Sequence, residues 1–302
     1  IPVSSRFTVT AKELSEFLNC CDSAGARRPR GLVISTPSNP TGAMLSREEV
    51  EELCELCKSE KILLICDEIY NGITYADSPT ECTAVSSIVG ESHCSNVPNE
   101  WICVVNSFSK LFCMTGWRLG WIVVPNWLTE SIVKLTQNLY ISAPTLSQEA
   151  ATSCWESSAQ NEIQSQIEKY AMNRALVLNV LNEMGLNAEL GEISPAQGGF
   201  YVYCDVFRFG ICALSRATEL KTTKWLMNAA ELCGRVLEEV YVAITPGVDF
   251  EDPESQLGLQ RIRISYSRSH QEVQRGMHHF QSWWNSNILS HSNQPIKILS
   301  TG

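Results

Sequence analysis

The amino-acid sequence predicts an α/β fold, in which a mostly parallel sheet flanked by helices is followed by a smaller α+β domain. Apolar runs of strand length alternate with helical patterns in the first half of the chain, as a parallel sheet requires. The later part offers three strands and two helices, which suit an α+β layer. With 302 residues, of which 44% are hydrophobic, the chain is long enough to form two cores.

These patterns divide the chain into three parts. We expect a large domain over residues 1–170, a small domain over residues 171–285 and a flexible tail over residues 286–302. The tail is polar and has no periodic pattern, so little apolar surface is available to hold it in place. Residues 77–99 are rich in Ser, Thr, Cys, Pro and acidic residues without periodicity, which predicts a surface insertion within the large domain.

The large domain is expected to contain four strands with helices between them. The strands are expected at residues 31–35, 62–66, 101–105 and 119–124. A capping box at Ser46-Arg47-Glu48-Glu49 predicts a helix that ends near Ser59. An earlier helix is expected over about residues 11–20, and a long helical pattern over residues 145–184 leads into the small domain. There, strands are expected at residues 199–205, 240–244 and 261–266, and helices at residues 221–239 and 271–285.

The charge argues against binding to nucleic acid or to anionic membranes. The formal net charge is -10 and the isoelectric point is near 5.1, without any basic run or basic face. No apolar stretch approaches the roughly 18 residues of a membrane span, and the first residues resemble neither a signal peptide nor a transit peptide. We therefore expect a soluble, cytoplasmic protein.

The thirteen cysteines are an odd number and are scattered through strand and helix patterns, which predicts reduced, buried thiols. Cys54 and Cys57 have a spacing found in metal and redox sites, but they share the apolar stripe of a predicted helix and no second ligand pair follows. Core packing is the favoured interpretation, and no metal is expected. His270, His278 and His279 fall on a predicted helix, where we expect solvated or capping side chains.

Polar motifs follow three of the predicted strands. They are Asn39-Pro40-Thr41-Gly42, Asp67-Glu68-Ile69-Tyr70 and Ser107-Phe108-Ser109-Lys110. Alone, the first motif would be interpreted as a turn, the second as the end of a strand with a solvated acid, and the third as a loop with a surface lysine. For Glu68 we keep the interpretation as a solvated acid. Ligands of open α/β sheets, however, bind beyond the carboxyl ends of strands. The common position of the three motifs therefore predicts a shared site.

The residue types suit an aldehyde cofactor with a pyridine ring. Lys110 is the candidate amine that would hold the aldehyde as a Schiff base. Asp67 can keep a pyridine nitrogen protonated, because a nearby carboxylate favours the charged form. Tyr70 and Asn39 can place polar groups on the ring oxygen. A cofactor phosphate would need dense donors, which the hydroxyls of the Ser107–Lys110 motif and a following arginine supply. The phosphate-binding candidates are Ser107, Ser109 and Arg118.

A second guanidinium is needed if the substrate is an amino acid, because an arginine binds a carboxylate through two parallel hydrogen bonds. Arg263 is the candidate, in the alternating strand pattern at residues 261–266. Arg261 lies two residues away on the same face of the strand and is the alternative. The sequence Arg263-Ile264-Ser265-Tyr266 favours Arg263.

Together, the motifs Asn-Pro-x-Gly, Asp-x-x-Tyr, Ser-x-Ser-Lys and Arg, in this order, resemble the class I/II aminotransferases among the fold-type I pyridoxal phosphate (PLP) enzymes. The resemblance runs over about residues 31–280. It implies PLP as cofactor, transamination between an amino acid and a 2-oxo acid, and a homodimer. It also implies that Lys110, Asp67 and Tyr70 are catalytic, that the freed amine of Lys110 moves the substrate proton, and that Asn39 touches both the cofactor and the substrate carboxylate.

The sequence departs from this family at its beginning. The family's large domain starts earlier than Ile1, with a Gly/Ser-rich turn and helix that bind the phosphate and an aromatic residue that stacks on the ring, and neither is found before Asn39. We therefore expect an N-terminally incomplete large domain, and the activity of this chain alone is a separate question. Two alternatives stay open: a lyase or synthase of the same fold, such as a carbon–sulfur lyase or a cyclopropane-forming enzyme, and a truncated, non-catalytic binding or dimerisation form.

Overall fold

The computed structural model describes residues 7–76, 78, 99–211 and 227–291. The chain forms two compact units, each assembled from segments that are not contiguous in the sequence. The first unit comprises Ile1–Asn39, Ala43–Ile167 and Gln197–Gly199. The second unit comprises Pro40–Gly42, Glu168–Ala196 and Phe200–Gly302. Most of the expected insertion at residues 77–99 lies outside the described residues.

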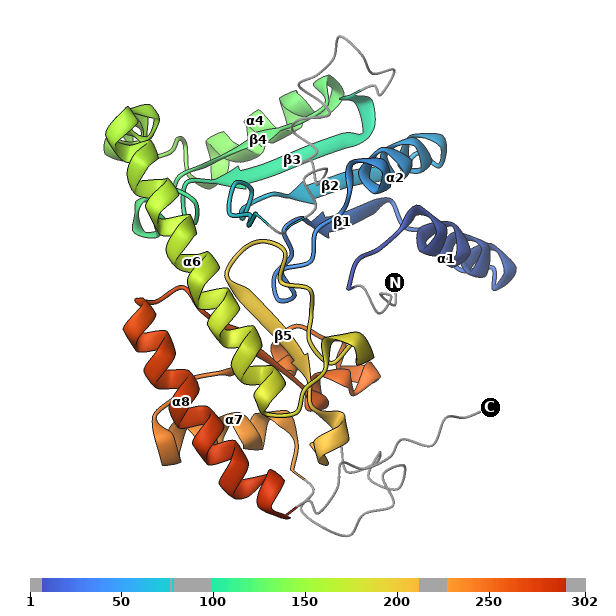
Figure 1. The fold of residues 1–302 in the computed structure, drawn as a ribbon. Coiled ribbons are helices and arrows are strands. Elements are labelled where there is room, and N and C mark those ends of the chain that lie inside the picture. The colour runs from blue at the N-terminus through green and yellow to red at the C-terminus, as the bar shows by residue number, and fades with distance from the viewer. Residues whose placement is uncertain (1–6, 77, 79–98, 212–226, 292–302) are drawn as a thin grey trace. The chain divides into compact units, whose positions relative to one another are not determined.

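The first unit contains a four-stranded sheet, and Figure 1 shows its strands side by side. The strands follow one another in the order of the sequence: β1 (Gly31–Ser35), β2 (Leu63–Asp67), β3 (Ile102–Ser107) and β4 (Gly120–Val123). The first three are parallel, and β4 pairs antiparallel with β3. This arrangement confirms the predicted mostly parallel sheet, and the bounds of β1 are those predicted.

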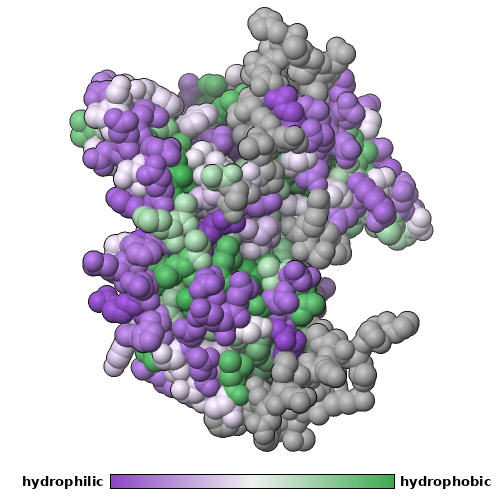
Figure 2. Space-filling model, in the orientation of Figure 1, coloured by the Kyte–Doolittle hydropathy of each residue, from purple (hydrophilic) through white to green (hydrophobic). Residues whose placement is uncertain are grey.

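Two helices pack with this sheet around an apolar core. They are α1 (Ala11–Ser23) and α2 (Arg47–Ser59). The predicted capping box is confirmed at Ser46, whose hydroxyl accepts a hydrogen bond from the Glu49 amide while the Glu49 carboxylate accepts one from the Ser46 amide. The visible side of both helices is mainly hydrophilic in Figure 2. The core contains buried residues from the helices and the strands, namely Leu14, Leu18, Ile34, Leu45, Val50, Leu53, Cys54, Cys57, Ile62, Leu64, Cys66, Ile102 and Val104.

Cys54 and Cys57 belong to this core, as predicted, with 2% and 0% of their surfaces exposed. Burial raises the pKa of the Cys57 thiol to about 11 and that of Cys54 to about 12. Both thiols are therefore protonated near neutral pH. The described cysteines are free thiols, and within the described ranges no group of three or more His, Cys, Asp or Glu side chains could hold a metal ion.

The helical segment that follows differs from the predicted one. Helix α4 (Asn126–Leu139) was not predicted, because Pro125 at its N-cap provides no side-chain hydrogen bond that would mark its start. The predicted long helix is divided into α5 (Thr145–Thr152) and α6 (Ser157–Glu183), and the boundary between the two units falls within α6. None of the helices in the described part of the chain is long and apolar enough to span a membrane.

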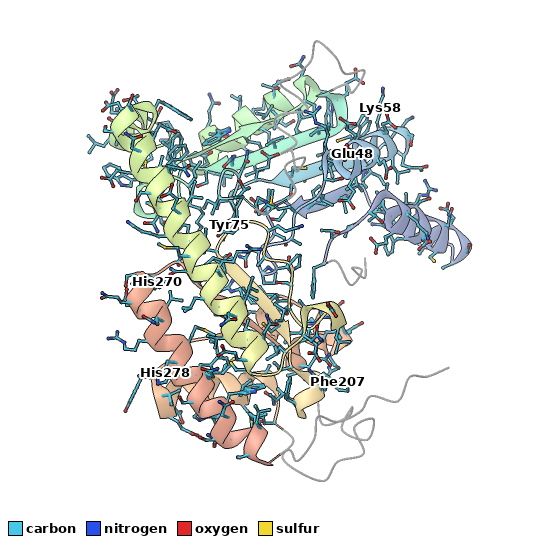
Figure 3. The ribbon with its side chains drawn as sticks, in the orientation of Figure 1. Glu48, Lys58, Tyr75, Phe207, His270 and His278 are labelled. Atoms are coloured by element: carbon cyan, nitrogen blue, oxygen red, sulfur yellow. The ribbon has the colours of Figure 1, made fainter. Side chains whose placement is uncertain are left out.

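The second unit contains an antiparallel sheet of three strands, in the order β5 (Tyr201–Asp205), β7 (Arg261–Ser265) and β6 (Thr245–Pro246). Its further helices are α7 (Ala229–Val240) and α8 (His270–Asn287). His270, His278 and His279 are exposed on α8, and Figure 3 labels two of them. Short 3-10 helices in the two units lie at Asn99–Trp101, Thr115–Trp117, Ser153–Trp155, Ala188–Leu190, Phe207–Phe209, Gly247–Asp249, Pro253–Ser255, Leu257–Gln260 and Leu289–His291.

Two predicted elements of the second unit need correction. The predicted strand at residues 240–244 is wrong: Val240 ends α7, Tyr241 closes the helix in a left-handed conformation, and the strand begins at Thr245. The apolar run resembles a strand in sequence but pairs with no strand among the described residues. The helix predicted over residues 221–239 begins at Ala229, where Asn228 and Glu231 form a capping box, and residues 221–226 lie outside the described part. Residues 292–302 of the expected tail also lie outside it.

We expect the core of the first unit to depend strongly on Leu64, which is fully buried in β2. The Leu64→Ala variant should lower the free energy of unfolding by about 2–5 kcal/mol, because it removes buried methyl groups and leaves a cavity. Leu139→Ala is the matched control, since Leu139 is 75% exposed at the end of α4 and its loss should change stability by less than about 0.5 kcal/mol. Denaturant titration measures both, and equal effects would contradict the assignment of this core.

Candidate active site

The loop after β1 holds Asn39 in a turn. The amide of Ser38 donates a hydrogen bond to the carbonyl of Ala43 (2.9 Å), which closes the loop around Asn39. The amide of Leu45 donates to the hydroxyl of the buried Thr36 (3.2 Å) and fixes the return of the chain. Asn39 itself is exposed at the tip of this turn. The loop that carries Asn39 is therefore ordered by its own hydrogen bonds.

Asp67 ends β2 and is partly buried. Its Oδ1 accepts a hydrogen bond from the Ile69 amide (3.1 Å), so the carboxylate begins a tight turn. The amide of Asn71 donates to the carbonyl of Glu68 (2.8 Å) within the same turn, and the buried Tyr70 follows. This turn places a carboxylate and a phenol at the carboxyl end of the same strand.

The prediction that Glu68 is a solvated acid is wrong, because Glu68 is 0% exposed. The amide of Glu68 donates to the carbonyl of Val105 (2.8 Å), so the backbone still follows the edge of the sheet. Alternation along a strand then places Glu68 on the same side as the buried Leu64 and Cys66. The Asn71 amide nitrogen lies 3.4 Å from its Oε2. The alternation with Leu64 and Cys66 was the available signal of this burial, but an acid after a strand is normally exposed.

The loop after β3 is organised by its serine hydroxyls. Ser107 Oγ accepts a hydrogen bond from the Ser109 amide (3.0 Å) and lies 2.8 Å from Ser109 Oγ. The carbonyl of Ser109, a residue that is 7% exposed, accepts a hydrogen bond from the Thr115 hydroxyl (2.7 Å). Lys110 is partly buried beyond this turn, and its Nζ lies 6.0 Å from the centre of the Tyr70 ring. The structure thus brings Lys110 and Tyr70 together, as the shared site requires.

Arg118 lies on the return from this loop to β4. It has a left-handed backbone conformation (φ 53°), is exposed, and donates from Nη1 to the carbonyl of Thr115 (3.0 Å). Two residues later, Gly120 permits close pairing of β4 with β3, because a Cβ at this position would come within 2.6 Å of the Asn106 carbonyl oxygen. The guanidinium is therefore held at the rim of the loop and not within it.

Three residues from much later in the sequence complete this part of the first unit. We refer to Gln197–Gly199 as the strap. The amide of Gly199 donates to the carbonyl of Ile73 (2.9 Å), and Tyr75, labelled in Figure 3, donates its hydroxyl to the carbonyl of Gly199. A Cβ on Gly198 would lie 2.5 Å from a carbon of Pro37, so only glycine fits there.

The strap also borders the predicted site, because Gly199 lies against the Tyr70 ring. These three residues fall within the small domain expected over residues 171–285, but they pack in the first unit. In the sequence, the pair Gly198-Gly199 indicates that another part of the chain packs closely against it, but it does not indicate which part.

In the second unit, Arg261 is neutralised by neighbouring acids. Its Nη1 lies 2.6 Å from Glu251 Oε1 and its Nε 3.3 Å from Asp205 Oδ2. Burial alone would lower the pKa of Arg261, but the bonds and charges of the two carboxylates outweigh this effect and raise it. Tyr203 joins the group by donating its hydroxyl to Glu251 (3.0 Å), and burial, with the negative charge of Glu251, raises the pKa of Tyr203. Gln260 donates to the other acid, Asp205 (2.7 Å).

Arg263 has different surroundings on the same strand. Its Cζ lies 4.4 Å from the centre of the Tyr201 ring and 4.5 Å from that of Phe250. Its Nη2 donates to the hydroxyl of Thr245 (3.3 Å). Two neighbouring arginines of β7 are thus held in two ways, Arg261 by carboxylates and Arg263 by aromatic rings and a hydroxyl.

The chain matches the family described as aminotransferase class I and II over residues 1–280. It is 33% identical to a valine–pyruvate aminotransferase of Mycobacterium tuberculosis over 84% of this chain and 57% of that protein. It is 31% identical to a (5-formylfuran-3-yl)methyl phosphate transaminase of Methanocaldococcus jannaschii over 94% of this chain and 63% of that protein. The chain therefore spans about three fifths of the length of these curated relatives.

Solved structures give the same similarity. A crystal structure of an aminotransferase from Mycobacterium tuberculosis aligns with a TM-score of 0.77 and 32% identity, over 95% of this chain and 64% of that one. An aromatic aminotransferase from Pyrococcus horikoshii aligns with a TM-score of 0.74 and 26% identity, over 93% and 65% of the two chains.

The close approach at Gly198 should make this position sensitive to the smallest side chain. We expect Gly198→Ala to lower the free energy of unfolding by about 1–3 kcal/mol, because the added methyl group overlaps Pro37. Gly234→Ala is the control, since it lies in α7 with open space around it and should be neutral or stabilising by up to about 1 kcal/mol. Urea titration of both variants checks this expectation, and a neutral Gly198→Ala would show that the strap is not packed as described.

Proposed function

Because this chain belongs to the class I and II aminotransferase family, we propose that it takes part in PLP-dependent transamination, with Lys110 as the residue that binds the cofactor covalently. The observation that carries the proposal is the distance of 6.0 Å between Lys110 Nζ and the Tyr70 ring, at the edge where β1, β2 and β3 end. An amine, a phenol and the carboxylate of Asp67 there fit the groups that PLP presents. The similarity to named aminotransferases favours this reaction over a lyase or synthase reaction of the same fold.

Each residue has a distinct proposed task. When bound, PLP supplies an aldehyde that takes up the amino group and a ring that takes up electrons from the substrate. Lys110 anchors the cofactor and, once released, moves the proton between substrate and cofactor atoms. Asp67 keeps the ring nitrogen protonated, because its negative charge favours the positive form. Tyr70 donates a hydrogen bond to the ring oxygen, and Asn39 reaches both that oxygen and the substrate carboxylate.

The phosphate would be bound by Ser107, Ser109 and Arg118. The two hydroxyls already lie 2.8 Å apart and can rotate to donate to an anion. Arg118 contributes a full positive charge and two or more donors from the rim of the loop. In a chain with a net charge of -10, such local donors are what would attract an anionic cofactor.

The proposed substrates are an amino acid and a 2-oxo acid, whose α-carboxylate Arg263 binds. Arg261 is the poorer candidate because Glu251 and Asp205 already take up its donors and its charge. Arg263 contacts the rings of Tyr201 and Phe250, which attract a cation without providing a negative charge. We also propose a homodimer, since members of this family are typically dimers.

The cofactor assignment predicts a covalent label on one lysine. Purified chain should develop a visible absorbance band with added PLP, and reduction with borohydride should leave a pyridoxyl group on the peptide that contains Lys110. Lys110→Ala should lose both signals, whereas Lys58→Ala should retain both, because Lys58 is an exposed residue of α2 (Figure 3). A label that persists in folded Lys110→Ala would contradict the assignment.

The role of Asp67 predicts an effect on the reaction rate. In Asp67→Asn, the rate at which an added amino acid changes the visible band should fall by at least about 100-fold, because the charge that holds the ring proton is lost. Asp22→Asn is the control, since Asp22 is an exposed residue paired with Arg28 and should react at the unchanged rate. Stopped-flow absorbance measures both rates, and equal rates would exclude this role for Asp67.

A further inference from the structure

We propose that a pocket of the first unit binds a small organic cation that carries a trimethylammonium group. The pocket has a volume of about 350 Å³, which suits a small molecule, and is lined by Glu100, Trp101, Val124, Asn126 and Trp127. Glu100 and Trp101 precede β3, and Val124 follows β4. Since β3 and β4 are antiparallel, the start of β3 and the end of β4 meet at one edge of the sheet. The loop that carries Lys110 follows the opposite end of β3, so the pocket is separate from the candidate active site.

The indole of Trp127 is held in place although it is exposed. Its Nε1 donates a hydrogen bond to the carbonyl of Glu100 (2.7 Å), which satisfies the single polar group of the ring. This bond joins the first turn of α4 to the start of β3, across 27 residues of sequence. Yet 56% of the Trp127 surface is exposed. The bond thus fixes the ring without covering it, and the ring stays accessible to a ligand.

Trp101 supplies a second ring beside the first. The two ring centres lie 6.1 Å apart, and the ring planes are inclined at 51° to each other. A cation is attracted to an aromatic face when it lies within about 6 Å of the ring centre. Because both indoles line the same pocket, one cation there can lie within reach of both rings. Inclined aromatic rings of this kind are a known means of binding methylated ammonium groups.

Glu100 gives the pocket a negative charge. It is exposed and forms no ion pair with any residue in the described part of the chain. The first turn of α4 also borders the pocket, and the amides of a helix N-terminus carry about half a positive charge. The full charge of the carboxylate outweighs this half charge, so the local field favours a cation.

The lining also selects the kind of cation. A primary ammonium group has three N–H donors, each of which needs an acceptor. A trimethylammonium group has no such donor and presents methyl groups, which pack on the faces of Trp101 and Trp127 while its charge is attracted by the rings and by Glu100. The net charge of -10 acts in the same direction over a longer range.

The experiment is a titration with choline of the full chain labelled with 15N in its tryptophan indoles. The Nε1–H resonances of Trp101 and Trp127 are assigned by their disappearance in Trp101→Phe and Trp127→Phe. Choline should shift both resonances. Dimethylbutanol, the uncharged isostere of choline with carbon in place of the nitrogen, should bind at least about 10-fold more weakly. A peptide that carries trimethyllysine should bind no more tightly than choline, and tighter binding would overturn the assignment to a free cation.

Two variants test the lining. Trp127→Leu and Glu100→Gln should each weaken choline binding by about 5-fold, as followed at the Trp101 resonance, because one removes a ring face and the other a charge. Trp127→Phe keeps an aromatic face and should bind more tightly than Trp127→Leu.

The matched controls are Trp155→Leu, which removes another exposed indole of the same unit, and Glu16→Gln, which removes the charge of an exposed residue of α1. Both should bind choline as the wild type does. Denaturant titration of every variant separates loss of the pocket from loss of the fold. Unchanged choline affinity in folded Trp127→Leu and Glu100→Gln would overturn the assignment of this pocket. Equal affinity for choline and dimethylbutanol, or wild-type resonances that do not respond to choline, would overturn the inference itself.

Discussion

The parallel register of β1, β2 and β3 is the constraint on which the candidate site depends. Ser35 is paired with Asp67, and Asp67 with Val105, so β1 and β2 end at one level and β3 continues two residues further, to Ser107. The loops that follow must then emerge at one edge, whatever their own sequences are. The core beneath the strands holds this register, because a shift by one residue would turn the buried Leu64 and Cys66 away from the helices. The chemistry of the site thus rests on apolar residues that take no part in it.

Electrostatics holds together one group of polar side chains in the second unit. Arg261, Glu251, Asp205 and Tyr203 form a closed group in which the charges satisfy one another. Buried charges are tolerated only when they are paired in this way. Arg263, two residues further on, contacts the rings of Tyr201 and Phe250 and the hydroxyl of Thr245. These contacts come from other elements, so the sequence of the strand alone does not reveal them.

Sequence patterns predicted the parts of the fold that depend on local interactions. The capping box at Ser46 and the apolar run of β1 lie within a few residues of the structure that they specify, and both are confirmed. Helix α4 was not predicted because no capping side chain marks its start. The apolar run at residues 240–244 was predicted as a strand, and only the structure shows that it pairs with no described strand.

The remaining surprises concern contacts between residues that are distant in the sequence. The rings that flank Arg263, for example, come from β5 and from the segment that follows Gly247–Asp249. Such contacts have no local signature. The positions of the motifs were informative for the site, because loops that follow adjacent parallel strands emerge at the same edge of the sheet.

The strap has a consequence for how the protein can be divided and made. Gln197–Gly199 belongs to the first unit although most of the second unit's chain flanks it in the sequence. A fragment that stopped at Ile167 would contain the whole sheet but would leave Ile73 and Tyr75 without the backbone that they bond. During synthesis on a ribosome, the first unit must likewise wait for residue 199 to emerge before its last hydrogen bonds can form. The two units are therefore linked in folding, even where their cores are separate.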